Sequence, residues 1–321
     1  MQPGHVWVDG EVRPGDGAHL SVFDRGFQLG DAVFETLRAR AGRVTELDEH
    51  VARLGRSANG LAIELPADIA DRLARGIGDL LAAEALDGPD GDASIRITVS
   101  RGVYLGRGLL PPEVHTTPTI AIQAWPVVPP PAGHLEQGIH LVASSVRRDP
   151  QNPLAMFKTT SRADYVYARL EARRAGADDA LFLTIDGLLS EATSANIFLV
   201  RHAPNGEAEL ATPGLDCAIL PGTTRSWLLG WGERVGLRPV EAWLTPRDLA
   251  AAEEAFVSSS VAGILPVTRF EGAPIGDGTP GPWTQRARAD REAMIVGPGD
   301  ADDPRSGDPA GGEPGSDSYR P

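Results

Sequence analysis

The segment Pro126-Val127-Val128-Pro129-Pro130-Pro131-Ala132-Gly133 contains four prolines and one glycine. It cannot continue a helix or a central strand, because proline has no backbone N–H to donate and its ring fixes one backbone torsion. We therefore expect an interdomain linker over residues 126–134. The chain of 321 residues then divides into a first domain over 1–125 and a second over 135–296.

Before the linker, hydrophobic periodicity predicts strands and helices in mixed order. We expect a hairpin over 6–12, strands over 32–40, 94–100 and 119–127, and helices over 46–61 and 68–86. Thr45 and Asp48 are spaced like a capping box at the start of the first helix. One face of the second helix gathers Ile69, Leu73, Ile77, Leu80 and Leu81.

After the linker the same mixture continues. We expect strands over 139–146 and 255–261, a hairpin turning at Asp186-Gly187, and helices over 162–175, after Gly222, after Thr245 and over 280–295. Val166, Tyr167 and Leu170 are in register on the first of these helices. Because there is no regular alternation of strand and helix, the pattern favours an α+β fold over a doubly wound sheet.

The last segment, 297–321, contains six Gly, five Pro and five Asp and almost no apolar residue. Such a composition cannot offset its ordering entropy, so we expect a disordered acidic tail.

Composition excludes several classes of function. The net charge of −14 makes nucleic acid and anionic membranes poor partners. A single Cys cannot form an internal disulfide, and the chain contains no apolar run long enough to span a membrane and no signal segment after Met1. We expect a cytoplasmic protein, and the scattered positions of the seven His predict no metal site.

Lys158 lies in Met156-Phe157-Lys158-Thr159-Thr160-Ser161, between a predicted strand and a predicted helix. Apolar neighbours would desolvate the ammonium group, lower its pKa and free the amine for Schiff-base chemistry. A lone lysine in a turn is more often solvated and idle, so only its context favours a catalytic role.

Glu191 lies in a stretch of small residues that ends at Asn196, before an apolar strand. A carboxylate there can keep a ring nitrogen protonated, which a neutral amide does not do. The alternative is an acid that faces water from a turn.

A third group of residues suits an anion. In Gly222-Thr223-Thr224 a glycine turn precedes a helix start, where free N–H groups and the helix dipole hold a phosphate. Ser259 and Ser260 at a strand end add hydroxyl groups, and Arg53 adds charge. Each has an ordinary alternative, since such residues also cap helices, face solvent, or extend along a helix surface.

Taken together, an amine, an acid and an anion cradle in this order match the needs of pyridoxal 5′-phosphate. The sequence here resembles the class IV, fold-type IV pyridoxal-phosphate enzymes: branched-chain aminotransferases, D-amino-acid aminotransferases and 4-amino-4-deoxychorismate lyases. The matching stretches are Asp24-Arg25-Gly26-Phe27-Gln28-Leu29-Gly30-Asp31-Ala32-Val33-Phe34-Glu35, Glu49-His50-Val51-Ala52-Arg53-Leu54, Lys158, Glu191-Ala192-Thr193-Ser194-Ala195-Asn196, Leu220-Pro221-Gly222-Thr223-Thr224-Arg225 and Pro266-Val267.

The resemblance implies a two-domain fold, the cofactor between the domains, and a homodimer. It makes Lys158 the Schiff-base lysine and proton shuttle, and it pairs Glu191 with the pyridine nitrogen. The residues that it implies for the phosphate are Arg53, Gly222, Thr223, Thr224, Ser259 and Ser260.

The resemblance also indicates three substrate residues. Phe34 stands where D-amino-acid aminotransferases have a carboxylate-binding Tyr, and Arg107 comes one residue later than their Arg, with no His directly after it. Tyr165 lies near the Tyr that contacts the cofactor's phenolic oxygen in branched-chain enzymes.

The resemblance leaves the reaction open. The main expectation is an aminotransferase that takes a small amino donor and a keto acceptor. The stretch Ser100-Arg101-Gly102 with Gly106-Arg107-Gly108 is more similar to the lyases that release pyruvate and 4-aminobenzoate. A catalytically silent binding protein of the same fold is the third reading.

Overall fold

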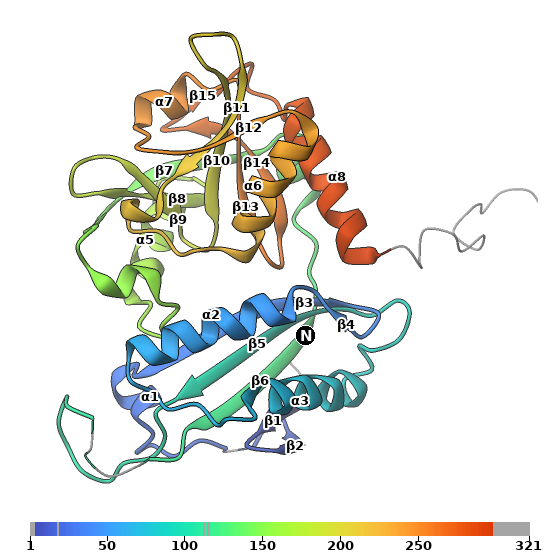
Figure 1. Ribbon diagram of the computed structural model, residues 1–321, viewed down its shortest axis with the longest axis vertical. Helices are drawn as coiled ribbons and strands as arrows, with labels where there is room; N and C mark the ends of the chain where they lie inside the picture. The colour runs from blue at the N-terminus through green and yellow to red at the C-terminus, as the bar shows by residue number, and fades with distance from the viewer. Residues whose placement is uncertain (1–3, 18, 112, 114–115, 298–321) are drawn as a thin grey trace, which may run out of the picture.

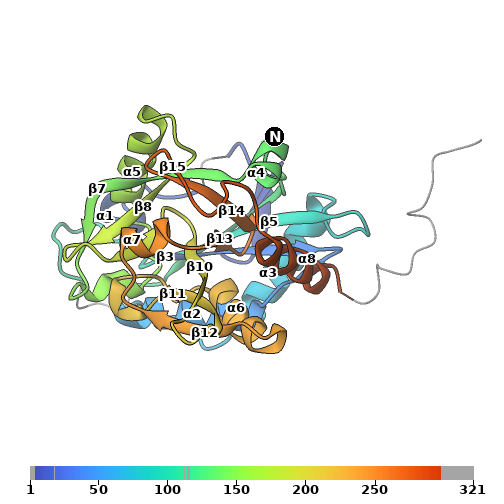
Figure 2. The ribbon, with the colours of Figure 1, turned by 90° about the horizontal axis from the view of Figure 1, so that it is seen from above.

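The structure is a computed structural model and describes residues 4–17, 19–111, 113 and 116–297. Its strands form two sheets, and Figure 1 shows the smaller one below the larger. Seen from above, the strands of the larger sheet lie over those of the smaller one (Figure 2). The predicted α+β fold is confirmed. The predicted tail lies outside the described residues, except for Gly297.

Over the described residues, six strands form the smaller sheet in the order β2-β1-β6-β5-β3-β4, and every pairing between them is antiparallel. They are β1 (His5–Val8), β2 (Glu11–Pro14), β3 (Ala32–Arg40), β4 (Arg43–Val44), β5 (Asp92–Ser100) and β6 (Thr119–Pro126).

The larger sheet, counted over the same part of the chain, has nine strands in the order β12-β11-β10-β13-β14-β7-β8-β9, with β15 paired to β14. Because β9 pairs with both β8 and β10, the strands from β10 to β9 close into a ring. The strands are β7 (Ile139–Arg148), β8 (Asp179–Thr184), β9 (Leu189–Ala192), β10 (Asn196–His202), β11 (Ala208–Pro213), β12 (Arg238–Ala242), β13 (Glu254–Ser259), β14 (Gly263–Phe270) and β15 (Ala273–Pro274).

Helices cover both sheets. The α-helices are α1 (Arg25–Leu29), α2 (Leu47–Gly60), α3 (Ile69–Ala83), α4 (Ala132–Glu136), α5 (Ala163–Arg174), α6 (Thr223–Val235), α7 (Pro246–Ala250) and α8 (Pro282–Val296), and two 3-10 turns are η1 (Pro153–Met156) and η2 (Leu215–Cys217). No helix in the described part of the chain has the length and hydropathy needed to cross a membrane.

The smaller sheet and its two helices enclose one hydrophobic core. Alternate residues of β5 are buried, and α3 adds the predicted face with Leu73, Ile77, Leu80 and Leu81. Ile69, at the start of that face, is partly buried. Burial of such a continuous face provides most of a helix's stability in a protein, which is why periodicity located α3 well.

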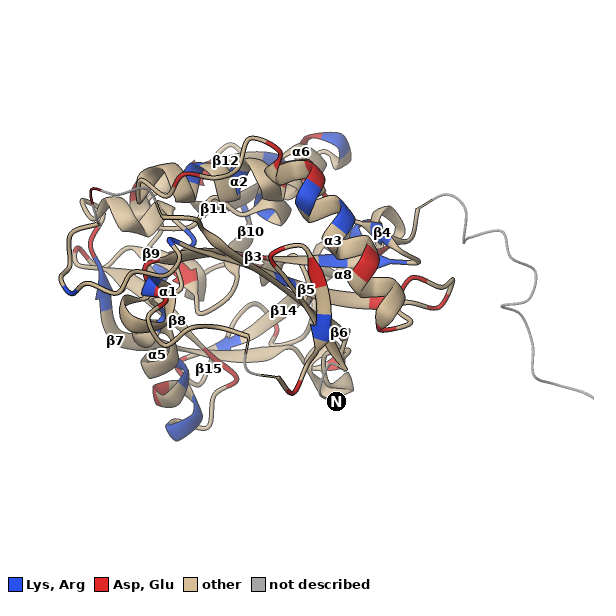
Figure 3. Cartoon of the chain, turned by 90° about the horizontal axis from the view of Figure 1, so that it is seen from below, with Lys and Arg blue, Asp and Glu red and all other residues tan. Residues whose placement is uncertain are grey.

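The predicted linker contains the crossing between the sheets. Residues 127–131 lie between β6, in the smaller sheet, and α4, and the helix begins directly after Pro131. The C-terminal helix α8 contacts β13 and β14 of the larger sheet and also β3 of the smaller one. It carries both basic and acidic residues (Figure 3).

Two local predictions were wrong. On α5 the helix buries Ala168 and Ala172, whereas Val166, Tyr167 and Leu170 are 59%, 48% and 41% exposed. The reason is space, because small residues let α5 lie close to the buried side chains of β7 and β8.

The second error concerns the start of α2. Its N-cap is Glu46, with a left-handed φ of 54° and no side-chain cap bond, so the Thr45–Asp48 capping box does not form. The N–H of Thr45 instead donates to the carbonyl of Arg38 at 2.8 Å, which keeps Thr45 in the β-hairpin.

Candidate active site

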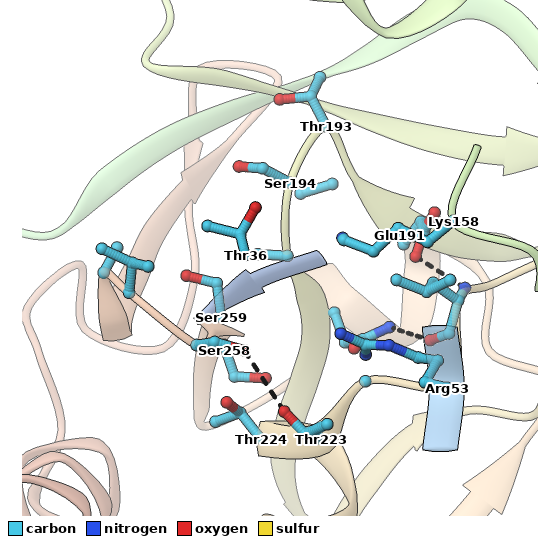
Figure 4. A pocket seen from close by; sticks show the side chains of 18 of the residues that line it. Thr36, Arg53, Lys158, Glu191, Thr193, Ser194, Thr223, Thr224, Ser258 and Ser259 are labelled. Atoms are coloured by element: carbon cyan, nitrogen blue, oxygen red, sulfur yellow. Dashed lines mark hydrogen bonds between the residues drawn. The ribbon is translucent and has the colours of Figure 1, made fainter. Parts of the chain in front are cut away.

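A cavity of about 420 Å³ lies between the two sheets. Figure 4 shows Lys158 and Glu191 close together, Arg53 entering from α2, and Thr223 at the start of α6. Nine residues that the sequence predicted for the site line this cavity: Phe34, Arg53, Lys158, Glu191, Gly222, Thr223, Thr224, Ser259 and Ser260.

The segment that carries Lys158 is held against the smaller sheet. The N–H of Phe34 on β3 donates to the carbonyl of Lys158 at 2.9 Å, and the N–H of Thr160 donates to the carbonyl of Ala32 at 2.9 Å. The N–H of Lys158 donates to Ser57 Oγ of α2 at 3.1 Å. A residue that follows the linker is thereby fixed by backbone bonds to strand β3, which precedes the linker.

The amine of Lys158 is partly neutral near physiological pH. Its Nζ lies 4.8 Å from the centre of the Phe34 ring. Burial, with Arg53 as the next contribution, lowers the pKa of Lys158 to about 8. A buried amine with this pKa can act both as a nucleophile and as a base.

Glu191, on β9, faces the cavity and is held from behind. Its Oε2 accepts from the N–H of Leu220 at 2.9 Å, and its Oε1 accepts from Arg148 Nη2 at 3.2 Å. Arg148 also donates to Asp164 at 2.9 Å and to the hydroxyl of Tyr165. The carboxyl group of Glu191 is thus fixed in position by a backbone N–H and a buried guanidinium group.

Arg53 is oriented by a buried acid that the sequence reasoning did not single out. Glu35 accepts from Arg53 Nε at 2.8 Å and Nη2 at 2.6 Å, and its Oε2 lies 2.8 Å from His50 Nδ1. Burial opposes the charge on Glu35, but Arg53 and His50 together lower its pKa to about 2. The third guanidinium nitrogen, Nη1, donates to the carbonyl of Pro221 at 3.0 Å, beside the glycine turn.

The start of α6 presents donors to the cavity. Gly222 is the N-cap and, having no side chain, makes no cap bond. No acceptor for the N–H groups of Thr223 and Thr224 is present among the described residues. Thr223 Oγ1 lies 3.3 Å from Ser260 Oγ and 3.4 Å from His50 Nε2.

One more hydroxyl at this site lacks a partner. Ser258 lines the cavity and is 2% exposed, yet within the described chain its Oγ makes no hydrogen bond. A buried hydroxyl without a partner is costly. It is satisfied if a polar ligand occupies the cavity.

Two arginines in the cavity were not predicted. Arg96 on β5 lies 4.0 Å from the centre of the Phe34 ring, and Arg162, at the start of α5, lies 5.8 Å from it. Neither forms an ion pair with any described residue, although Arg162 donates to the carbonyl of Thr193 at 3.0 Å and lies over the Tyr165 ring. Burial and the charge of Arg162 lower the pKa of Arg96. Two close, unpaired guanidinium groups favour an anionic ligand.

Two predicted substrate residues do not join this group. Arg107 is exposed on the loop after Gly106 and does not line the cavity. Arg96 lines the cavity instead, from the face of β5 opposite its buried residues.

Tyr165 lies behind Glu191 instead of in the cavity, with its hydroxyl 3.3 Å from Glu191 Oε1. Burial and the nearby Glu191 raise the pKa of Tyr165 to about 12, so its hydroxyl keeps its proton at neutral pH.

Comparisons with known proteins agree with this geometry. The profile of the family described as amino-transferase class IV matches residues 32–270. A Methanocaldococcus jannaschii relative, provisionally named a branched-chain-amino-acid aminotransferase, is 35% identical over 88% of this chain and 93% of its own. The D-alanine aminotransferase of Bacillus licheniformis is 29% identical over 91% of this chain and 97% of its own.

Two solved structures share the fold, and one of them adds the cofactor. The branched-chain amino acid aminotransferase of Escherichia coli has a TM-score of 0.83 and 27% identity, and the match covers 91% of this chain and 95% of that one. Another branched-chain amino acid aminotransferase, solved with pyridoxamine 5′-phosphate, has a TM-score of 0.81 and 25% identity over 92% of this chain and 95% of its own. The family resemblance read from the motifs is thus confirmed. The chain belongs to the class IV aminotransferases, which depend on pyridoxal 5′-phosphate.

Proposed function

We propose that this aminotransferase transfers the amino group of a branched-chain amino acid to a keto acid, with Lys158 as the amine that joins the aldehyde of pyridoxal phosphate. The observation that carries the proposal is the cavity itself. A lysine with a lowered pKa, the carboxyl group of Glu191 and the cradle at Thr223 line one space. Its size, about 420 Å³, lies in the range of small-molecule sites.

The described residues fit the cofactor. The unpartnered hydroxyl of Ser258 and the free N–H groups at the start of α6 need an acceptor, and a phosphate provides several. When bound, pyridoxal phosphate supplies an aldehyde that condenses with amines and a ring that accepts electrons from the α-carbon of an amino acid.

Lys158 is proposed to move the proton of the reaction. Because its pKa is about 8, Nζ can accept a proton from the α-carbon of the substrate and return it at neutral pH. Burial and the neighbouring charges of Arg53 and Arg162 disfavour the protonated form of the amine. The bonds from Phe34 and Ser57 to the backbone of Lys158 hold the amine in place.

The other roles follow from charge. Glu191, oriented by Arg148, would pair with the ring nitrogen in its protonated form. Arg53, Gly222, Thr223, Thr224, Ser259 and Ser260 would bind the phosphate. Arg96 and Arg162 are left to bind the substrate carboxylate, because the described residues supply no acid for them.

The substrate class is proposed from the relatives and from the lining. The relative with 35% identity is named for branched-chain amino acids, and the cavity offers Phe34, Leu220 and Val261 as apolar surface beside the two arginines. An apolar side chain can lie against this surface while the carboxylate meets a guanidinium group.

The test begins with the purified protein and pyridoxal phosphate. We expect a visible absorption band in the wild type that borohydride reduces, and no such band in Lys158→Ala. A panel of L- and D-amino acids with several keto acids should then show turnover with leucine, isoleucine and valine. Turnover of aminodeoxychorismate to 4-aminobenzoate in place of transamination would instead establish the lyase, and a wild type without the band would refute the proposal.

We also propose a homodimer. Large apolar side chains gather on two neighbouring segments, where Phe27 is 74% exposed, Leu109 83% and Leu110 85%. The loop that contains Leu109 and Leu110 is held in place by buried Arg25, which donates to the carbonyls of Gly108 and Leu109. A fixed apolar surface of this kind fits a second copy of the chain. Sedimentation at micromolar concentration should give a dimer, and Leu109→Asp should shift it toward monomer.

A further inference from the structure

The C-terminal helix α8 brings a buried guanidinium group to the back of the cavity wall. Arg291 is 1% exposed, although it lies on a helix whose neighbouring residues are largely exposed. Its Nη1 and Nη2 donate to Glu46 Oε1 and Oε2 at 2.7 and 2.9 Å. Such a bidentate ion pair is geometrically specific as well as strong.

The acid of this pair is held in an unfavourable backbone conformation. Glu46 is the N-cap of α2 and has a φ of 54°, a left-handed conformation that residues other than glycine rarely adopt. Arg291 and the neighbouring Thr223 and His50 lower the pKa of Glu46, against the effect of burial. The pair therefore joins α8 to the start of the helix that carries Arg53.

Arg291 also contacts the anion cradle directly. Its Nη2 donates to Thr224 Oγ1 at 3.3 Å, and its guanidinium carbon lies 5.1 Å from the centre of the Trp227 ring. Thr224 lines the cavity and is 2% exposed. Because the Thr224 oxygen accepts a bond from Arg291, the hydroxyl hydrogen remains to be donated to another group. A ligand in the cavity can provide the acceptor.

We propose that Arg291 is a positioning residue for the phosphate of the cofactor: it orients the Thr224 hydroxyl as a donor into the cavity and fixes α2 against α6. The inference rests on the proposed function, because it assumes that the cavity binds pyridoxal phosphate at this end. Arg291 itself does not line the cavity, so it acts through Thr224 and Glu46.

The experiment compares two ligands that differ only in the phosphate, pyridoxal phosphate and pyridoxal, by equilibrium binding to the apoprotein. The variants are Arg291→Met, Thr224→Val and the double substitution. Arg288→Met, at an exposed position of the same helix, is the matched control. The melting temperature of each apoprotein measures the structural effect separately.

We expect Arg291→Met to lower the affinity for pyridoxal phosphate about tenfold, equivalent to about 1.4 kcal/mol, with little change for pyridoxal. Thr224→Val should lose a similar factor, and the double variant should lose no more than the larger single loss, because both remove the same bond. Arg288→Met should match the wild type.

Two results would overturn the inference. Equal weakening of both ligands together with a lower melting temperature would make Arg291 a purely structural residue, and additive losses in the double variant would separate it from Thr224. A wild type that binds pyridoxal as tightly as pyridoxal phosphate would instead refute the phosphate cradle, and with it the proposed function.

Discussion

Lys158 shows how far burial and neighbouring charges change a residue's chemistry. With a pKa of about 8, roughly a tenth of its side chains are neutral at pH 7, against fewer than one in a thousand for a lysine of ordinary pKa. The neutral amine is the reactive form, so reaction with an aldehyde should become faster as the pH rises and level off above pH 8.

The rate of pyridoxal binding to the apoprotein should therefore rise about tenfold from pH 6 to pH 7 and reach a plateau near pH 9. Stopped-flow absorbance follows it, and Lys158→Ala gives the baseline. Pyridoxal is the better probe because it has no phosphate whose ionisation overlaps this range. A midpoint near pH 10 would show that the amine is solvated.

Glu35 makes the free energy of unfolding depend on pH in the acidic range. Its folded pKa of about 2 lies below the unfolded value, so its contribution is complete above about pH 4.5 and is lost as the pH falls toward 2. In Glu35→Gln, the buried Arg53 loses the negative charge of its partner and one of the two oxygens that accept its hydrogen bonds. We expect a loss of about 3–5 kcal/mol in the free energy of unfolding at pH 7.

Urea unfolding at pH 7 and pH 3 measures this loss. Because the wild-type carboxylate contributes less at the lower pH, the difference between wild type and Glu35→Gln should shrink there. Glu11→Gln is the control, since Glu11 pairs with Arg13 at 3.0 Å on the surface and should contribute at most about 1 kcal/mol. An unchanged difference at pH 3 would contradict the assignment of the shift to Glu35.

At the same scale, sequence reasoning found residues whose type is demanded by chemistry and missed those that support them. Lys158, Glu191 and Thr223 stand in motifs, so their roles could be predicted before any contact was known. Glu35 and Arg96 are ordinary strand residues by pattern, and their importance arises from a partner or a missing partner far along the chain. Such information is contained in the tertiary packing.

Helix ends give a direct comparison at the level of elements. From sequence, Thr45 was predicted to begin a capping box and a helix was predicted to follow Thr245. Only Thr245 forms a capping box, in which its Oγ1 accepts from the N–H of Asp248 at 3.3 Å. The hydroxyl of Thr45 is buried without a partner in the described chain. The same signal thus has opposite energetic consequences at the two positions.

We expect Thr245→Ala to lower the free energy of unfolding by about 1 kcal/mol, since it removes a cap. Thr45→Val should be neutral or stabilising by up to about 1 kcal/mol, because it replaces an unsatisfied hydroxyl by a methyl group of the same shape. Chemical denaturation of both variants beside the wild type measures the two effects. A clear loss in Thr45→Val would show that its hydroxyl has a partner after all.

Strand positions were predicted better than helix faces. The predicted strand over 32–40 coincides with β3, since a strand in which both faces are largely buried is recognised by its apolar run. The face of α5 was wrong because periodicity identifies large apolar residues, whereas a closely packed helix buries alanine. Which face of a helix is buried therefore depends on the surface that the helix packs against. The sequence of the helix alone does not specify that surface.

For the whole molecule, the cavity unites the two sheets. Phe34, Arg53 and Arg96 come from the smaller half, while Lys158, Glu191 and Thr223 come from the larger. The chain carries a net charge of −14, yet the cavity gathers several cations. Net charge predicted which macromolecules to exclude, but only the fold separates a basic cavity from an acidic exterior.

A ligand that contacts both halves binds only when they are docked, so it must stabilise both together. At a pyridoxal phosphate concentration of 100 times its dissociation constant, we expect about 2.7 kcal/mol of added stability. Hydrogen exchange should slow in β3 and β5 of the smaller sheet as well as in β10 and β13 of the larger one.

The edge strands β2 and β12, which contribute no residue to the cavity lining, serve as internal controls and should change least. Protection confined to the larger sheet would mean that the cofactor contacts that half alone. In that case the bonds from Phe34 and Ser57 to Lys158 would hold the lysine without coupling the halves, and the smaller sheet would serve the substrate only. Equal protection of both sheets would show that cofactor binding and docking of the two halves are one equilibrium.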